Sequence, residues 1–173
     1  METSDHPIHL IIAGARAPFC ETMKTVLEGE PEMRVVALAH EGHGTIVLAE
    51  ELRPDVVILV GNLPHGDGLE MTTVLKELLP ETRILLIAEE QSDELLDAAL
   101  FAGVDGYLTK DGSLADLGAG IRTLARGEQL IPPSMLGGVI DRMLCRHAER
   151  EKALLIEFVQ RHEPLPSLLG VES

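Results

Sequence analysis

The sequence predicts an α/β fold in which a doubly wound, five-stranded parallel sheet is covered by helices on both faces. Two observations lead to this prediction. Short apolar runs recur along the chain, and each is followed by a segment that carries apolar residues at helical spacing. Because strictly alternating strands and helices are joined by right-handed crossovers, the helices come to lie on both faces of the sheet.

Five short apolar runs are interpreted as buried parallel strands. They cover residues 9–13, 34–38, 56–60, 83–87 and 105–108. Five strands in an alternating α/β chain favour the flavodoxin-like order 2-1-3-4-5. In that architecture a site lies outside the carboxyl ends of the strands, so the residues that follow each run are the ones to inspect.

The segments between the strands are interpreted as crossover helices. Their apolar residues recur at helical spacing over residues 19–27, 46–52, 71–78 and 95–100, and a fifth helix is expected over 114–126. Proline and glycine mark the ends, as Pro31, Pro80 and Gly103 do. A chain of 173 residues can bury one full core, so one domain with an appendage is expected.

The appendage follows Pro132 and is predicted to be helical. Its apolar stripe, which includes Met135, Val139 and Met143, indicates one long helix or two abutting ones that end before Pro164. Such a stripe is unstable alone in water and must pack on its own domain, on a second copy or on another domain. We therefore divide the chain into a domain over 1–132, a dimerisation or linker helix over 133–162 and a linker-like tail over 163–173.

Composition excludes several classes of protein. The formal net charge of -15 disfavours direct binding to nucleic acid or to anionic lipid. The polar start of the chain and the lack of a bilayer-length apolar stretch predict a cytoplasmic protein without membrane contact. Cys20 and Cys145 are far apart and have no metal-ligand spacing, which is typical of two ordinary thiols.

Three motifs resemble the receiver domain of NarL/FixJ (LuxR-type) response regulators. They are Leu-Arg-Pro-Asp-Val-Val over 52–57, Leu-Pro-His-Gly-Asp-Gly over 63–68 and Gly-Val-Asp-Gly-Tyr-Leu-Thr-Lys-Asp over 103–111. The resemblance covers roughly residues 8–132. It implies the receiver fold and a role in two-component signal transduction and transcription regulation.

The chain departs from the family at the residues that carry its chemistry. The resemblance places Gly14 and Ala15 at the acidic pair that holds magnesium, and Val60 at the aspartate that accepts the phosphoryl group. Magnesium binds carboxylate oxygens, and phosphorylation needs a carboxylate nucleophile. We therefore expect an atypical, phosphorylation-independent pseudo-receiver over 1–132, with no catalytic residue, phosphoacceptor, metal or cofactor.

Asp55 and Asp67 do not replace the missing nucleophile. Asp55 begins the strand that Val60 ends, and five steps of roughly 3.3 Å place it about 17 Å away. Asp67, paired with Gly68, is interpreted as a turn residue.

Two further positions of the expected pocket come from the same resemblance. Ala88 replaces the hydroxyl residue that would bind a phosphoryl oxygen, and Lys110 is the one pocket residue that remains. Lys110 is interpreted either as a cation that binds an anion or holds a loop, or as a solvated charge near Asp105 and Asp111. Tyr107 stands where receivers couple the pocket to an interaction surface. Its other interpretation is a half-buried strand residue with a wet hydroxyl.

The leading hypothesis is a regulator, not an enzyme, that acts as a homodimer. A small-molecule ligand or protein partner would bind the degenerate pocket, because lost carboxylates leave an apolar cleft. DNA would be bound only by a helix-turn-helix domain outside this chain. The alternatives are a stand-alone interaction module and a flavodoxin-like enzyme that uses a nucleotide or flavin. Residues 14–18 offer no convincing phosphate-binding loop for the enzyme.

Overall fold

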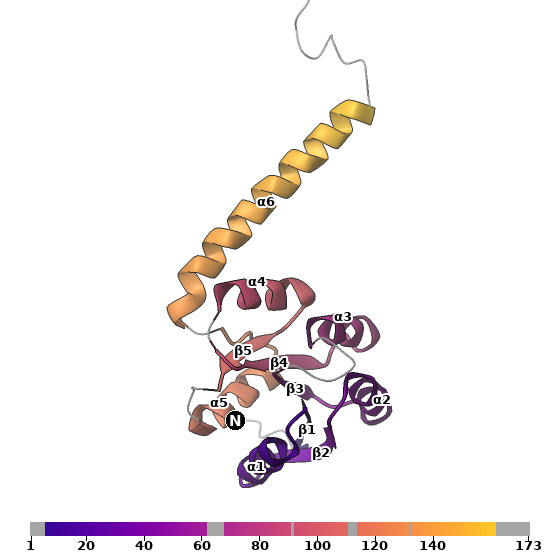
Figure 1. The fold of residues 1–173 in the computed structure, drawn as a ribbon, viewed down its shortest axis with the longest axis vertical. Coiled ribbons are helices and arrows are strands. Elements are labelled where there is room, and N and C mark those ends of the chain that lie inside the picture. The colour runs from indigo at the N-terminus through magenta and orange to yellow at the C-terminus, as the bar shows by residue number, and fades with distance from the viewer. Residues whose placement is uncertain (1–5, 62–67, 91, 111–113, 132, 162–173) are drawn as a thin grey trace, which may run out of the picture. The chain divides into compact units, whose positions relative to one another are not determined.

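The computed structural model describes residues 6–61, 68–90, 92–110, 114–131 and 133–161 (Figure 1). Strands and helices alternate along them as the sequence predicted. The elements are β1 (Ile8–Gly14), α1 (Ala17–Glu28), β2 (Met33–Ala39), α2 (Gly42–Leu52), β3 (Val56–Val60), α3 (Gly68–Leu78), β4 (Arg83–Ala88), α4 (Asp93–Ala102), β5 (Gly106–Thr109), α5 (Leu114–Ala125) and α6 (Pro133–Arg161).

The five strands form one parallel sheet in the order β2-β1-β3-β4-β5, which confirms the predicted order. Their register aligns the carboxyl ends, since Gly14 pairs with Val60, Val60 with Ile87, and Ala88 with Thr109. We call these strand ends, with the residues that follow them, the carboxyl edge. The strand starts, with the residues that precede them, form the amino edge.

Helices cover both faces of the sheet, as the alternation of elements predicted (Figure 1). On one face, α1 and α5 supply Met23, Leu27 and Ile121 to a core that also contains Ile12 and Ile58. On the other face α2, α3 and α4 lie next to one another, and each turns buried residues toward the strands. Each fully buried side chain of this size stabilises the fold by about 1.5–3 kcal/mol, so both faces contribute to stability.

Burial on both faces explains why the sequence of the central strand, β3, lacks an alternating pattern. All residues of β3 are buried, because helices cover it from both sides. The apolar run therefore predicted the position of this strand correctly. It did not predict which of its side chains face which layer of helices.

Several predicted boundaries differ from the structure by one or more residues. The fifth strand begins at Gly106 rather than at Asp105, although the backbone N–H of Asp105 still donates to the carbonyl of Ile84 at 2.9 Å. The carboxylate of Asp105 pairs with cations at the amino edge. The second helix begins at Gly42, earlier than its apolar residues indicated. Buried Thr45 belongs to that first turn, and its hydroxyl donates to the carbonyl of Glu41 at 2.9 Å. A threonine whose hydroxyl is bonded to the backbone can be buried without contributing to an apolar pattern.

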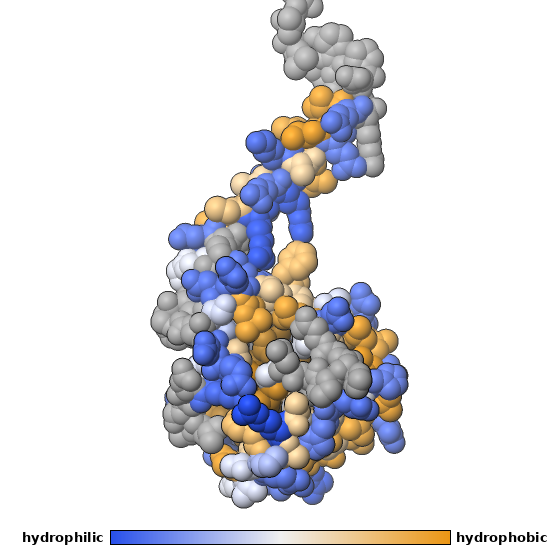
Figure 2. All heavy atoms as spheres, in the orientation of Figure 1, coloured by the Kyte–Doolittle hydropathy of each residue, from blue (hydrophilic) through white to orange (hydrophobic). Residues whose placement is uncertain are grey.

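The appendage forms a single helix, α6, rather than two abutting ones. The chain divides into two compact units, residues 1–135 and 136–173, and α6 contributes to both. Apolar side chains are exposed along α6 among hydrophilic ones (Figure 2), including Ile140, Leu144, Leu154 and Phe158.

The described residues leave one prediction about the appendage untested. The side chains of Met135, Val139 and Met143 lie outside the described residues, so their interface role stays a prediction. Among the helices that the structure describes, α6 included, none combines the length and the apolarity needed to cross a membrane.

Candidate functional site

The carboxyl edge brings together the positions that the sequence singled out. Gly14, Val60 and Ala88 end β1, β3 and β4, and all three are buried. Ala15 follows β1 and is exposed. None of these residues carries an oxygen ligand or a nucleophile on its side chain, so the ends of the three strands are apolar.

A thiol fills the space beside Gly14. A Cβ atom added at Gly14 would lie 2.8 Å from Cys20 Sγ and 3.2 Å from Val60 Cβ. Cys20 is fully buried, and burial raises the pKa of its thiol. The charge of Glu21 raises this pKa further, while that of Lys110 opposes the shift. A thiol in this state is protonated at neutral pH and acts as a small apolar packing group.

Lys110 is held in place by a carboxylate that the sequence analysis did not assign to the site. Its Nζ donates to Glu89 Oε1 at 2.6 Å, and its backbone N–H donates to the carbonyl of Ala88 at 2.9 Å. The same Nζ lies 4.9 Å from the centre of the Phe19 ring, a cation–π geometry. The interpretation that places Lys110 near Asp105 is wrong, because Asp105 lies at the amino edge. Its other expected neighbour, Asp111, lies outside the described residues.

Glu89 is therefore a site residue that sequence reasoning missed. Its side chain is 59% exposed, as is usual for a surface acid. The hydrogen bond and charge of Lys110 nevertheless hold the pKa of this carboxyl below its usual range, and Arg16 adds a smaller effect in the same direction. Its position directly after Ala88, at the carboxyl end of a strand, was the signal that could have identified it.

His40 also contacts the site, although its sequence context is that of a solvated loop histidine. Its Nδ1 lies 3.0 Å from the carbonyl oxygen of Gly14 and links the end of β2 to the end of β1. Within the described ranges, no three His, Cys, Asp or Glu side chains gather as metal ligands. The contact of His40 with a backbone carbonyl is a hydrogen bond between two strand ends.

Tyr107 is more deeply placed than the half-buried strand residue considered from sequence. Its side chain is fully buried, and its hydroxyl donates to the carbonyl of Glu90 at 3.3 Å. Burial raises the pKa of the phenol. The residue thus connects β5 to the loop after β4. Its coupling role remains a prediction.

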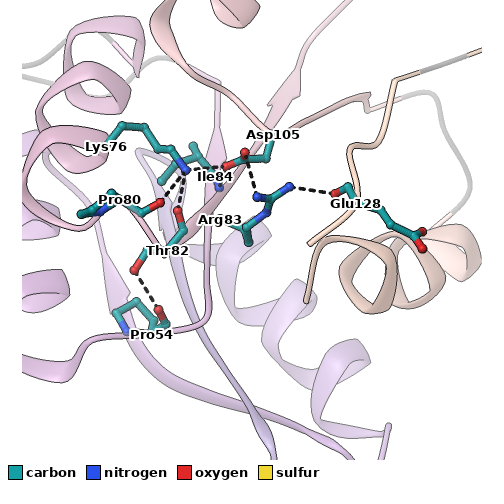
Figure 3. A network of polar contacts seen from close by, with 8 residues as sticks. All are labelled: Pro54, Lys76, Pro80, Thr82, Arg83, Ile84, Asp105 and Glu128. Carbon is teal, nitrogen blue, oxygen red and sulfur yellow. Dashed lines mark hydrogen bonds and ion pairs between the residues drawn. The ribbon is translucent and has the colours of Figure 1, made fainter. Parts of the chain in front are cut away.

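A network of polar contacts lies at the amino edge (Figure 3). Asp105 Oδ2 accepts from Lys76 Nζ at 3.0 Å and from the backbone N–H of Ile84 at 2.9 Å. Arg83 Nη1 lies 3.4 Å from Asp105 Oδ1, and Arg83 Nη2 donates to the carbonyl of Glu128 at 3.0 Å. These bonds join α3, β4, β5 and the segment after α5.

Asp55 belongs to the amino edge too. Its Oδ2 accepts from the backbone N–H of His9 at 2.8 Å, so it stands at the start of β1 and β3. This confirms that Asp55 lies at the wrong end of the strand to replace a nucleophile at Val60.

Comparison with known proteins relates the chain to one family. The model of the response regulator receiver domain matches residues 11–122. The chain is 27% identical over 167 residues to the transcriptional regulatory protein DegU of Brevibacillus brevis, covering 95% of this chain and 71% of that protein. It is 30% identical over 141 residues to the response regulator protein VraR of Staphylococcus aureus, covering 82% of this chain and 65% of that protein.

Solved structures show the same fold. A two-component response regulator of the LuxR family from Aurantimonas sp. SI85-9A1 aligns with a TM-score of 0.73 at 24% identity, over 80% of this chain and 99% of that one. RcsB, in a structure of two dimers bound to two parallel DNAs, aligns with a TM-score of 0.70 at 22% identity, over 78% of this chain and 68% of that one.

Proposed function

This chain belongs to the family of response regulator receiver domains, and we propose that it regulates transcription without being phosphorylated. The observation that carries the proposal is the lack of side-chain carboxylates at Gly14, Ala15 and Val60 on the carboxyl edge. Gly14 and Val60 are paired at neighbouring strand ends, and the resemblance to the family assigns them, with Ala15, to the positions of the magnesium-binding acids and the phosphoacceptor. Glu89, the carboxylate found beside them, is already paired with Lys110. One engaged carboxylate cannot serve as both metal ligand and nucleophile.

A role in transcription is supported by the relatives rather than by this chain's own surface. DegU is a transcriptional regulatory protein, and the RcsB structure contains DNA. This chain spans 71% of DegU and 65% of VraR. With its net charge of -15 it is poorly suited to contact phosphates. We assign DNA contact to a domain outside this chain, and to the receiver the control of that domain.

Control by dimerisation is the second part of the proposal. RcsB occurs as dimers in the structure with DNA. In this chain, Leu154 is 58% exposed on α6 and Phe101 is 73% exposed on α4. Two exposed apolar positions on different elements offer two surfaces for self-association. The apolar strand ends at Gly14, Val60 and Ala88 remain as the position for a small-molecule or protein ligand.

Intact mass and light scattering, before and after incubation with acetyl phosphate and Mg²⁺, test the loss of phosphorylation. We expect an unchanged mass and a dimer in both samples. Glu89→Gln is the matched control for the carboxylate found at the edge. An adduct in the native chain that is absent from Glu89→Gln would identify Glu89 as an acceptor and contradict the proposal. An adduct in both proteins would contradict it as well and place the acceptor elsewhere.

The dimer surface is tested by one charge on each candidate element. Light scattering of Leu154→Glu and Phe101→Glu is compared with the native chain, with Glu149→Gln as a control on the charged surface of α6. A monomer for only one of the two glutamate variants identifies the interface. A native chain that is monomeric at high concentration would contradict control by dimerisation.

A further inference from the structure

The carboxylate of Glu89 stands over three neighbouring strand ends. Glu89 follows β4, and its Oε1 lies 2.6 Å from Nζ of Lys110, which follows β5. The same oxygen lies 3.6 Å from the position that a Cβ of Gly61 would take, directly after β3. Gly61 has a φ of +65°, the left-handed region that favours glycine, and adds no side chain of its own beside the carboxylate. The oxygen thus lies at the middle of the carboxyl edge, one residue beyond Val60.

Positive charge from two loops is directed at this carboxylate. Lys110 donates to it and is itself backed by the ring of Phe19. Arg16, from the loop after β1, adds a favourable charge. Both effects favour the ionised form, so the carboxyl carries its negative charge at neutral pH. The carboxylate of Glu89 is therefore an anion of the chain itself that lies beside Lys110 and within the influence of Arg16.

A ligand that needs Lys110 as its cation would have to displace this anion. The Lys110 ammonium already donates a charge-assisted hydrogen bond, and a second anion at the same point would meet the charge of Glu89. We propose that Glu89 is a built-in anion that occupies the anion position of the carboxyl edge and keeps phosphate and carboxylate ligands away from Lys110. This inference rests on the proposed function, because it concerns how the carboxyl edge of an unphosphorylated chain excludes anions.

The proposal narrows the chemistry of a ligand at this edge. An external phosphate or carboxylate is excluded while Glu89 holds Lys110. A ligand that binds next to Gly14, Val60 and Ala88 is then neutral and largely apolar, because the side chains of these three residues carry neither charge nor oxygen atoms.

Titration with inorganic phosphate tests the proposal. The NMR signals of the Lys110 side-chain ammonium and backbone amide are followed in the native chain, in Glu89→Gln and in Glu90→Gln. The two variants have the same net charge, so they differ only in which carboxylate is removed. We expect Glu89→Gln to bind phosphate at Lys110 at least tenfold more tightly than the native chain, and Glu90→Gln to behave like the native chain.

Two more variants separate charge from structure. Glu89→Asp keeps the carboxylate and should restore exclusion at least in part, whereas Lys110→Met combined with Glu89→Gln should abolish the gained binding. If Glu89→Gln binds phosphate no more tightly than Glu90→Gln, the proposal is overturned, and this includes the case in which neither binds. Because the titration uses inorganic phosphate and no phosphodonor, its outcome is independent of the mass measurement that tests phosphorylation.

Discussion

The two edges of the sheet use charge in opposite ways. At the amino edge, Asp105 is 10% exposed and is held by Lys76, Arg83 and a backbone N–H. At the carboxyl edge, the ion pair of Lys110 with Glu89 is accompanied by apolar packing, and Glu89 is largely solvated. The difference shows that a network of buried polar contacts can serve the packing of a domain. Here that network joins strands and helices at the edge away from the carboxyl ends.

Burial explains why the two ion pairs are expected to differ in their effect on stability. Removing one partner of a buried, hydrogen-bonded charge leaves the others uncompensated in a medium of low dielectric. An exposed pair is screened by water and salt, and its loss changes the free energy of unfolding little. The amino edge should therefore determine stability, and the carboxyl edge should determine which ligands bind.

The largest difference between the two edges is expected for Asp105→Ala. The change leaves Lys76, Arg83 and the N–H of Ile84 without their shared acceptor, so we expect the free energy of unfolding to fall by about 3 kcal/mol. Urea denaturation measures the change. Glu77→Ala removes an exposed acid from α3 and serves as the control. Equal losses for the two variants would show that the Asp105 network does not stabilise the fold.

The substitution Gly14→Ala tests how closely the carboxyl edge is packed. The added methyl would overlap with Cys20 Sγ and crowd Val60, so we expect a loss of about 1–2 kcal/mol in the free energy of unfolding. In a Cys20→Ala background the same change should cost clearly less, because the overlapping sulfur is gone. Gly44→Ala, whose added methyl would meet only ordinary contacts, is the control. Equal costs in both backgrounds would contradict the role of Cys20 as the packing group.

The smallest effect concerns Tyr107, which links β5 to the loop after β4. Tyr107→Phe removes the hydrogen bond to the carbonyl of Glu90, and we expect a loss of about 1 kcal/mol at neutral pH. Burial raises the pKa of the folded-state phenol above the unfolded value of 10.0. The stability that the neutral phenol contributes is therefore fully present below the unfolded-state pKa of 10.0. It is lost as the pH rises through the higher pKa of the folded state.

Urea denaturation of the native chain and Tyr107→Phe at rising pH checks the sign. The difference in the free energy of unfolding between the two proteins should narrow above about pH 10, where the unfolded phenol ionises. A difference that stays constant through the alkaline range would mean that the Tyr107 hydroxyl contributes no pH-dependent stability.

Sequence reasoning located the strand ends but misjudged what surrounds them. It placed Val60 at the end of a strand and Gly14 and Ala88 directly after strands, because buried apolar runs mark strands and topology puts their ends at one edge. One of its two interpretations of Lys110 placed the ammonium near Asp105, and this neighbour was wrong. Asp105 is close to Lys110 in sequence, yet β5 separates the two residues along its whole length. Glu89 is far from Lys110 in sequence and becomes its partner only because β4 and β5 are paired.

By itself, the sequence determined the alternation of strands and helices, the order of the parallel sheet, and the absence of carboxylates at Gly14, Ala15 and Val60. These follow from the spacing of apolar residues and from residue identity, which are local properties of the chain. Only the tertiary structure decided that Cys20 fills the space beside Gly14, and that Glu89 rather than Asp105 holds Lys110. Such contacts join residues that are distant in sequence, and they depend on strand register and helix placement, which no local pattern encodes.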